Sequence, residues 1–129
     1  MILIDSSGRL EFFADGPNAA DFSTPLRNIK NIVVPTICLY EVFKVVLRER
    51  SEGEALQAIA LMRQGKVVDL TPELALQAAI VSTDSKISMA DSIIFATAQS
   101  FQATIWTQDE HFKGLPRVEF FPKKPAPGP

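Results

Sequence analysis

The chain begins with an apolar run that ends abruptly in polar residues, Met1-Ile2-Leu3-Ile4-Asp5-Ser6-Ser7. A short, uninterrupted apolar run is typical of a strand that is buried on both faces. Aspartate or serine directly after such a run is typical of a helix cap. We therefore predict a buried strand followed at once by a helix from Gly8 to about Phe13.

The same alternation of strand and helix continues along the chain. Further strands are predicted at residues 32–34, 67–70, 104–106 and 118–120. Apolar spacing and capping residues predict helices at about 19–27, 36–50, 54–63, 71–82 and 88–101, with Thr36, Thr71 and Ser88 as caps. This order predicts an α/β fold with a mainly parallel central sheet of about five strands flanked by helices.

The chain has 129 residues, which fits one domain with a core of its own. We expect that domain to occupy residues 1–121. The proline-rich segment 122–129 is incompatible with a helix or a central strand and is predicted to be a disordered tail.

Composition predicts where the protein is found and which partners it has. No apolar run approaches the roughly 20 residues of a membrane-spanning helix, and the N-terminus lacks a basic leader, so we expect a cytoplasmic protein without a membrane partner. The single Cys38 lies in an apolar run and is predicted to be buried and reduced. The net charge of −2 argues weakly against general nucleic-acid binding.

Four acids lie where a parallel sheet would bring them together. Asp5 and Asp109 follow predicted strands, Asp91 opens a predicted helix, and Glu41 lies in the second turn of another. Strand carboxyl ends and helix N-termini share one edge of an open α/β sheet, and ligands bind at that edge. We therefore predict that Asp5, Glu41, Asp91 and Asp109 converge.

Each acid also has a purely structural interpretation. Asp5 and Asp109 can cap the turns that follow them, and Asp91 fits the third position of a capping box opened by Ser88. Glu41 is harder to explain in this way, because it emerges beside the apolar face of its helix and a buried carboxylate needs a partner. Lys44, three residues on, offers an ordinary ion pair.

Four clustered carboxylates would repel one another unless cations offset their charge. Oxygen ligands of this kind favour Mg²⁺ or Mn²⁺, whereas zinc prefers histidine and cysteine. The chain has one histidine, His111, and one cysteine, so a zinc site is not expected. We interpret His111 as a surface or packing residue.

The same residues resemble a known family. The ordered set of motifs is similar to that of PIN-domain proteins, and most of all to VapC-type toxins of toxin–antitoxin pairs. It comprises Ile4-Asp5-Ser6-Ser7, Pro35-Thr36 with Glu41, Ser88-Met89-Ala90-Asp91-Ser92, and Trp106-Thr107-Gln108-Asp109 with Phe112. The resemblance runs from Met1 to about Phe121. Ser92 departs mildly from the pattern, because such proteins often have alanine there.

The resemblance implies an activity and partners. It implies Mg²⁺- or Mn²⁺-dependent endonucleolytic cleavage of RNA, with Asp5, Glu41, Asp91 and Asp109 as metal ligands and catalytic residues. Ser6 and Thr107 match positions that support the site. It further implies a homodimer and a cognate antitoxin. Cations such as Arg9, Lys44, Lys86 or Lys113 would have to steer the RNA.

Two other interpretations deserve comparison. A phosphatase of the haloacid-dehalogenase type would need Asp-x-Asp after the first strand, where this chain has Asp5-Ser6-Ser7, and the acids of a response-regulator receiver are not matched either. A PIN-like module that binds RNA or protein without cutting would not need all four acids. Their joint presence favours an enzyme over this alternative.

Overall fold

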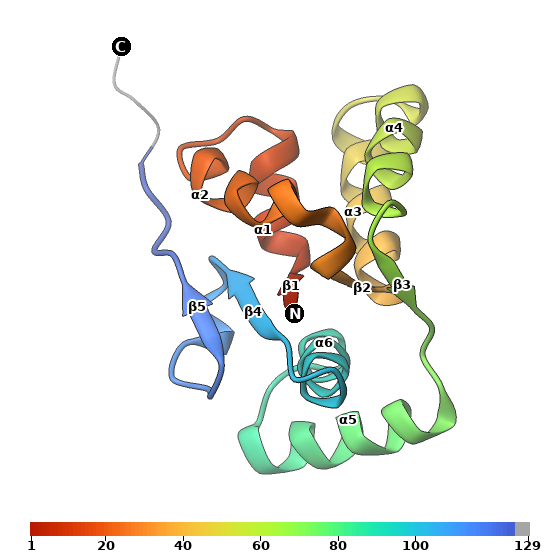
Figure 1. The fold of residues 1–129 in the computed structure, drawn as a ribbon, viewed down its shortest axis with the longest axis vertical. Helices are drawn as coiled ribbons and strands as arrows, with labels where there is room; N and C mark the ends of the chain where they lie inside the picture. Colours follow the sequence, from red (N-terminus) through yellow and green to blue (C-terminus); the bar gives the residue numbers. More distant parts are fainter. Residues whose placement is uncertain (126–129) are drawn as a thin grey trace.

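The computed structural model describes residues 1–125 and shows helices packed around a small central sheet (Figure 1). Its elements, in chain order, are β1 (Ile2–Ile4), α1 (Ser6–Phe13), α2 (Ala19–Ser23), η1 (Thr24–Asn31), β2 (Val33–Pro35), α3 (Thr36–Glu49), α4 (Glu52–Met62), β3 (Lys66–Val68), α5 (Pro72–Ser85), α6 (Met89–Ser100), β4 (Thr104–Thr107), η2 (Glu110–Phe112) and β5 (Val118–Phe120); η1 and η2 are 3₁₀ helices. Strands and helices alternate as predicted.

The sheet confirms the predicted α/β class. β4 lies between β1 and β5, β2 pairs with β3, and each of these pairings is parallel. A single parallel bridge between Ile2 and Ile32 joins the three-stranded and two-stranded parts. The spatial order is therefore β3-β2-β1-β4-β5, with β1 at the centre.

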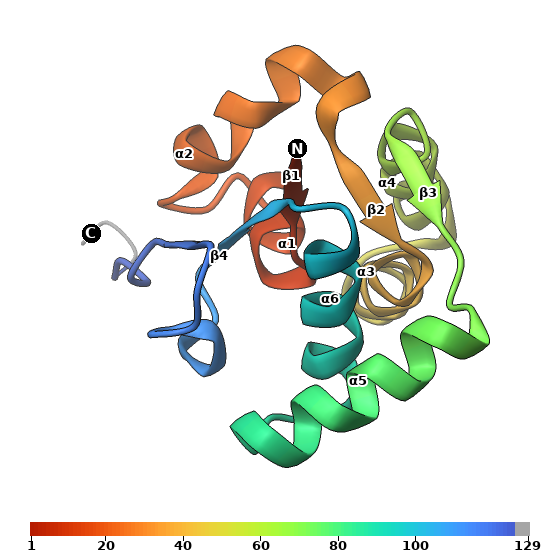
Figure 2. The ribbon, with the colours of Figure 1, turned by 60° about the horizontal axis from the view of Figure 1, so that its bottom comes forward.

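Burial of both faces explains why the sequences of β1 and β2 are continuous apolar runs. Leu3 and Ile4 in β1, and Val33 and Val34 in β2, are at most 2% exposed. Helices cover the sheet, so these strands have no face that alternates toward water. Figure 2 shows α5 and α6 side by side, and the α6 residues from Ser92 to Ala98 are all buried.

Close packing at α1 depends on a glycine. A Cβ atom at Gly8 would lie 2.7 Å from the ring of Phe22 and 2.8 Å from Ile4. Contacts this short do not occur in real structures, so any side chain here would push α1 away from β1 and α2. Because Asp5 joins β1 to α1, this packing also fixes the position of Asp5.

Several boundaries differ from the sequence predictions. Thr36 is not a helix cap: Pro35 holds that position without a side-chain hydrogen bond, and Thr36 is the first residue of α3. The helix predicted at 19–27 ends at Ser23 and continues as η1, where Pro25 is buried. Thr71 and Ser88 do cap α5 and α6 through their hydroxyls, as predicted.

The predicted tail begins within the described part of the chain. The carbonyl of Pro122 accepts a hydrogen bond from Asn18 Nδ2 at 3.0 Å, and Lys124 Nζ lies 3.7 Å from Asp21 Oδ2. Residues 126–129 lie outside the described residues, so the disorder expected there stays a prediction. Within residues 1–125, no helix combines the length and apolar character needed to cross a bilayer.

Candidate active site

Asp5 stands at the carboxyl end of the central strand. Its backbone N–H donates to the carbonyl of Trp106 at 3.2 Å, so it lies beside the end of β4. Its Oδ1 accepts from the N–H of Gly8 at 2.9 Å, which confirms the predicted cap of α1. Its Oδ2 accepts from the Thr107 hydroxyl at 2.6 Å. The cap and the place at the sheet edge are therefore compatible.

Burial makes Asp5 an unusual carboxyl group. It is only 2% exposed, and this burial raises its pKa to about 6. Hydrogen bonds from Thr107, Gly8 and Ser7 lower the pKa in part, while the charge of Asp109 raises it further. A charged Asp5 is therefore costly in the metal-free protein, and a nearby cation would offset that cost.

Thr107 links Asp5 to Asp109. Its hydroxyl donates to Asp5 and accepts from the backbone N–H of Asp109 at 2.9 Å. The residue is fully buried at the end of β4, so its side chain is held in place. Thr107 is one of the two residues predicted to support the site, and the structure places it between two of the acids.

Ser6 connects Glu41 to the same edge. Its hydroxyl donates to Glu41 Oε1 at 2.6 Å across the gap between α1 and α3. Glu41 is half-buried. Burial raises the pKa of the nearby Cys38 thiol to about 12, and the negative charges of Asp5 and Glu41 contribute to this increase. The full burial of Cys38 confirms that part of its prediction.

The predicted alternative for Glu41 is not found. Lys44 makes no ion pair with Glu41 within the described part of the chain; its ammonium group lies 5.7 Å from the centroid of the Tyr40 ring. Lys44, Lys86 and Lys113 are exposed, as a role in steering RNA would need. Arg9 is only 2% exposed, and burial lowers its pKa to about 10. The prediction that Arg9 steers RNA at the surface is therefore wrong.

Asp91 and Asp109 meet through a residue that we had not predicted for the site. His111 Nδ1 lies 3.1 Å from Asp109 Oδ1 and 3.3 Å from Asp91 Oδ2. One ligand atom from each of the three residues falls within 4.8 Å of the others. Burial and then the charge of Asp109 raise the pKa of Asp91.

The four acids are thus joined by contacts, although not all belong to one compact group. A path of direct contacts and chain neighbours runs from Glu41 through Ser6 to Asp5, then through Thr107 to Asp109 and through His111 to Asp91. Of the four acids, only Asp91 and Asp109 belong to the compact group with His111. The arrangement offers carboxylate oxygens at one sheet edge, and the pKa of Asp5 and of Asp91 is raised there, which suits a hard divalent cation.

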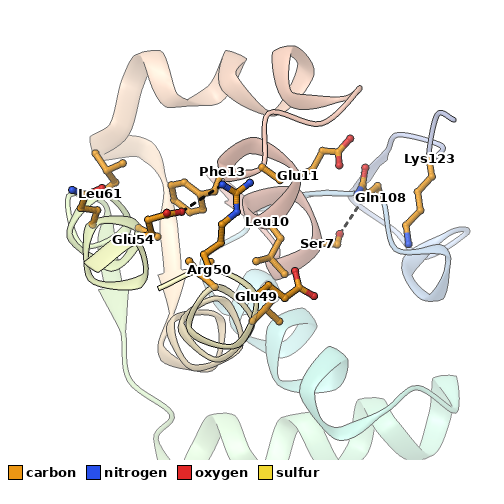
Figure 3. Close-up of a pocket in the computed structure, with 15 residues that line it drawn as sticks. Ser7, Leu10, Glu11, Phe13, Glu49, Arg50, Glu54, Leu61, Gln108 and Lys123 are labelled. Carbon is orange, nitrogen blue, oxygen red and sulfur yellow. Dashed lines mark hydrogen bonds and ion pairs between the residues drawn. The ribbon is translucent and has the colours of Figure 1, made fainter. Parts of the chain in front are cut away.

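A groove leads away from this edge between α1 and the α3–α4 pair (Figure 3). Its volume is about 510 Å³, and apolar side chains such as Leu10, Val46 and Leu61 line it. At one end the Ser7 hydroxyl accepts from the N–H of Gln108 at 3.2 Å and donates to Asp5 Oδ1 at 2.8 Å. The groove therefore reaches to within one hydrogen bond of Asp5.

Comparison with known proteins agrees with this geometry. The family model of the PIN domain matches residues 2–118, and the chain belongs to the PIN domain family. No curated protein sequence matches the chain.

Solved structures share this fold at low identity. A toxin–antitoxin complex from Klebsiella pneumoniae is 20% identical with a TM-score of 0.77, over 92% of this chain and 96% of that one. VapC20 of Mycobacterium tuberculosis, described as a toxin that cleaves the sarcin–ricin loop, is 19% identical with a TM-score of 0.77, over 92% and 98%. VapBC2 of Rickettsia felis bound to a promoter DNA fragment is 18% identical with a TM-score of 0.74, over 93% and 98%.

Proposed function

We propose that the protein is a metal-dependent endoribonuclease and the toxin of a toxin–antitoxin pair. The observation that supports this most is the path of contacts joining the four acids at one sheet edge. Membership of the PIN family and the likeness to toxins of known structure point the same way. A module that only binds RNA would gain nothing from placing four carboxylates together, because RNA is itself negatively charged.

Asp5, Asp91 and Asp109 would hold the principal Mg²⁺ or Mn²⁺ ion, and Glu41 would complete a second site or orient a water molecule. When bound, the ion supplies a more acidic water and offsets charge on the phosphate. Thr107 fixes the rotamer of Asp5 through its hydrogen bond, and Ser6 does the same for Glu41. Glu41 Oε2 has no hydrogen-bond partner among the described residues and can accept a proton from the attacking water.

A product analysis tests this proposal. Purified protein is incubated with structured RNA in EDTA, Mg²⁺ or Mn²⁺. We expect cleavage only with metal and a 5′-phosphate on the product, because water attacks the phosphorus and the 3′ oxygen leaves as the P–O3′ bond breaks. Because burial raises the pKa of Asp5 to about 6, a proton competes with metal below that value, so cleavage should fall as the pH drops through 6. A 2′,3′-cyclic phosphate, or cleavage in EDTA, would disprove the mechanism.

The groove beside the site suits the antitoxin of such a pair. Apolar side chains of α1, α3 and α4 line it together with charged residues such as Glu49 and Arg50 (Figure 3). An amphipathic helical segment of the antitoxin would bury its apolar face here and would end near Ser7, close to the acids. Such an occupant would block access to the site. A homodimer, which the resemblance implies, stays a prediction.

A charge placed in the groove should weaken antitoxin binding and leave cleavage intact. Leu61 lines the groove and is 47% exposed, whereas Leu76 lies on α5 outside it and is 70% exposed. Against the protein encoded by the adjacent gene, we expect Leu61→Glu to weaken binding about 30-fold, or about 2 kcal/mol, because it buries a charge. Leu76→Glu is the matched control. Equal losses in both variants, measured by calorimetry, would place the antitoxin elsewhere.

A further inference from the structure

His111 extends the acidic cluster with a nitrogen donor. Its Nδ1 lies 3.1 Å from Asp109 Oδ1 and 3.3 Å from Asp91 Oδ2, although 72% of its side chain is exposed. The ring stands against two acids whose negative charges repel each other.

The fold places this ring with some precision. The side chain of Asp109 caps η2 by accepting from the backbone N–H of His111 at 2.9 Å. The next residue, Phe112, is fully buried in the core and anchors the short helix. His111 therefore has a fixed backbone, and its side chain stands beside the N-terminal turn of α6, which holds Asp91.

The distances from His111 Nδ1 to the two acids are those of neighbouring ligands on one ion, and all three donor atoms lie within 4.8 Å of one another. In an octahedral site with metal–ligand distances of about 2.1 Å, adjacent donors lie about 3.0 Å apart. The two distances from His111 Nδ1, 3.1 and 3.3 Å, are close to this value. Small side-chain movements would thus let His111, Asp91 and Asp109 share an ion.

We propose that His111 is a metal ligand that makes this site favour Mn²⁺ and other transition-metal ions over Mg²⁺. The inference rests on the proposed function, because it concerns the same ion. Imidazole nitrogen binds first-row transition metals much better than Mg²⁺, which prefers oxygen and keeps its waters. A site made of carboxylates alone would discriminate far less between Mn²⁺ and Mg²⁺.

The competing explanation is that His111 only forms hydrogen bonds with the two acids. The same distances fit that role. The two roles differ in what the loss of the ring does to metal binding. Removing a ligand weakens transition metals selectively, whereas removing a hydrogen-bonding neighbour frees both carboxylates and affects every divalent ion alike.

Calorimetric titration of the metal-free protein with Mg²⁺, Mn²⁺ and Co²⁺ separates these roles. The titrations compare wild type, His111→Ala and the control Glu110→Gln, which changes an exposed residue of the same short helix. At about pH 8, where imidazole can ligate as the neutral base, we expect His111→Ala to weaken Mn²⁺ and Co²⁺ at least tenfold and Mg²⁺ less than about twofold. The visible spectrum of the Co²⁺-loaded protein should also change in His111→Ala and stay unchanged in Glu110→Gln.

Each other outcome overturns the inference in a recognisable way. Unchanged Mn²⁺ and Co²⁺ affinities in His111→Ala, or an equal change in the affinity for all three ions in either direction, would show that the ring only contacts the acids. If the His111→Ala titrations give either of these results while the wild type binds Mg²⁺ and cleaves RNA, the proposed function stands without this inference. If wild type binds none of the ions and cleaves in EDTA, both fail.

Discussion

Asp91→Asn is expected to lower the rate of RNA cleavage by about 10³-fold. A metal ion at a scissile phosphate supplies several kcal/mol of transition-state stabilisation, and losing about 4 kcal/mol of it corresponds to that factor. The substitution keeps the size of the side chain and removes the charge that would hold the ion. The compact group holds Asp91, Asp109 and His111, so the substitution leaves it with one carboxylate.

The fold should survive this change. Burial and the charge of Asp109 raise the pKa of Asp91, so a neutral amide relieves repulsion in the metal-free protein, and we expect no fall in thermal stability. Asp84→Asn is the matched control: Asp84 is exposed on α5 and lies outside the site. Initial rates with saturating Mn²⁺, measured beside circular dichroism, decide the question. Equal rates for Asp91→Asn and wild type would remove Asp91 from the site.

Local sequence was enough to predict the strands and most helix starts. The Thr71-Pro72 start of α5 and the serine before α6 each act through contacts within four residues, and the apolar run of β1 stands out by composition alone. Such local signals do not depend on the rest of the fold. The prediction of convergence at one edge also needed only the parallel order of the strands.

Residues that depend on distant contacts were the ones missed. Arg9 lies on a helix that packs against both α2 and α3, so a position that is usually exposed has no path to water. His111 meets Asp91 only because the turn after β4 folds back beside the start of α6. Neither spacing nor composition contains this information. Ser7, which hydrogen-bonds to Asp5, could have been suspected from its place two residues after the cap.

The cap interpretations of Asp5 and Asp109 are both confirmed, and neither excludes a role at the site. Each carboxylate accepts a backbone N–H at the start of a helix and also faces the other acids. A cap fixes the rotamer of a short acidic side chain, which is what a metal ligand needs. The two interpretations, which the sequence set against each other, describe one arrangement.

Phe112 shows how far the core and the site depend on each other. It is fully buried and completes the turn that presents Asp109 and His111. We expect Phe112→Ala to lower the free energy of unfolding by about 3–5 kcal/mol, because it removes a buried ring and leaves a cavity. That is a large share of the roughly 5–15 kcal/mol that stabilises a typical domain.

Urea unfolding followed by circular dichroism measures this loss, with Phe120→Ala as the control. Phe120 lies on the edge strand β5 and is partly exposed, so its loss should cost less, about 1–2 kcal/mol. Below the unfolding transition, the Phe112 variant should also bind Mn²⁺ more weakly, because η2 loses its anchor. A cost equal to that of Phe120→Ala, with Mn²⁺ affinity unchanged, would mean that the cap from Asp109 alone holds the turn.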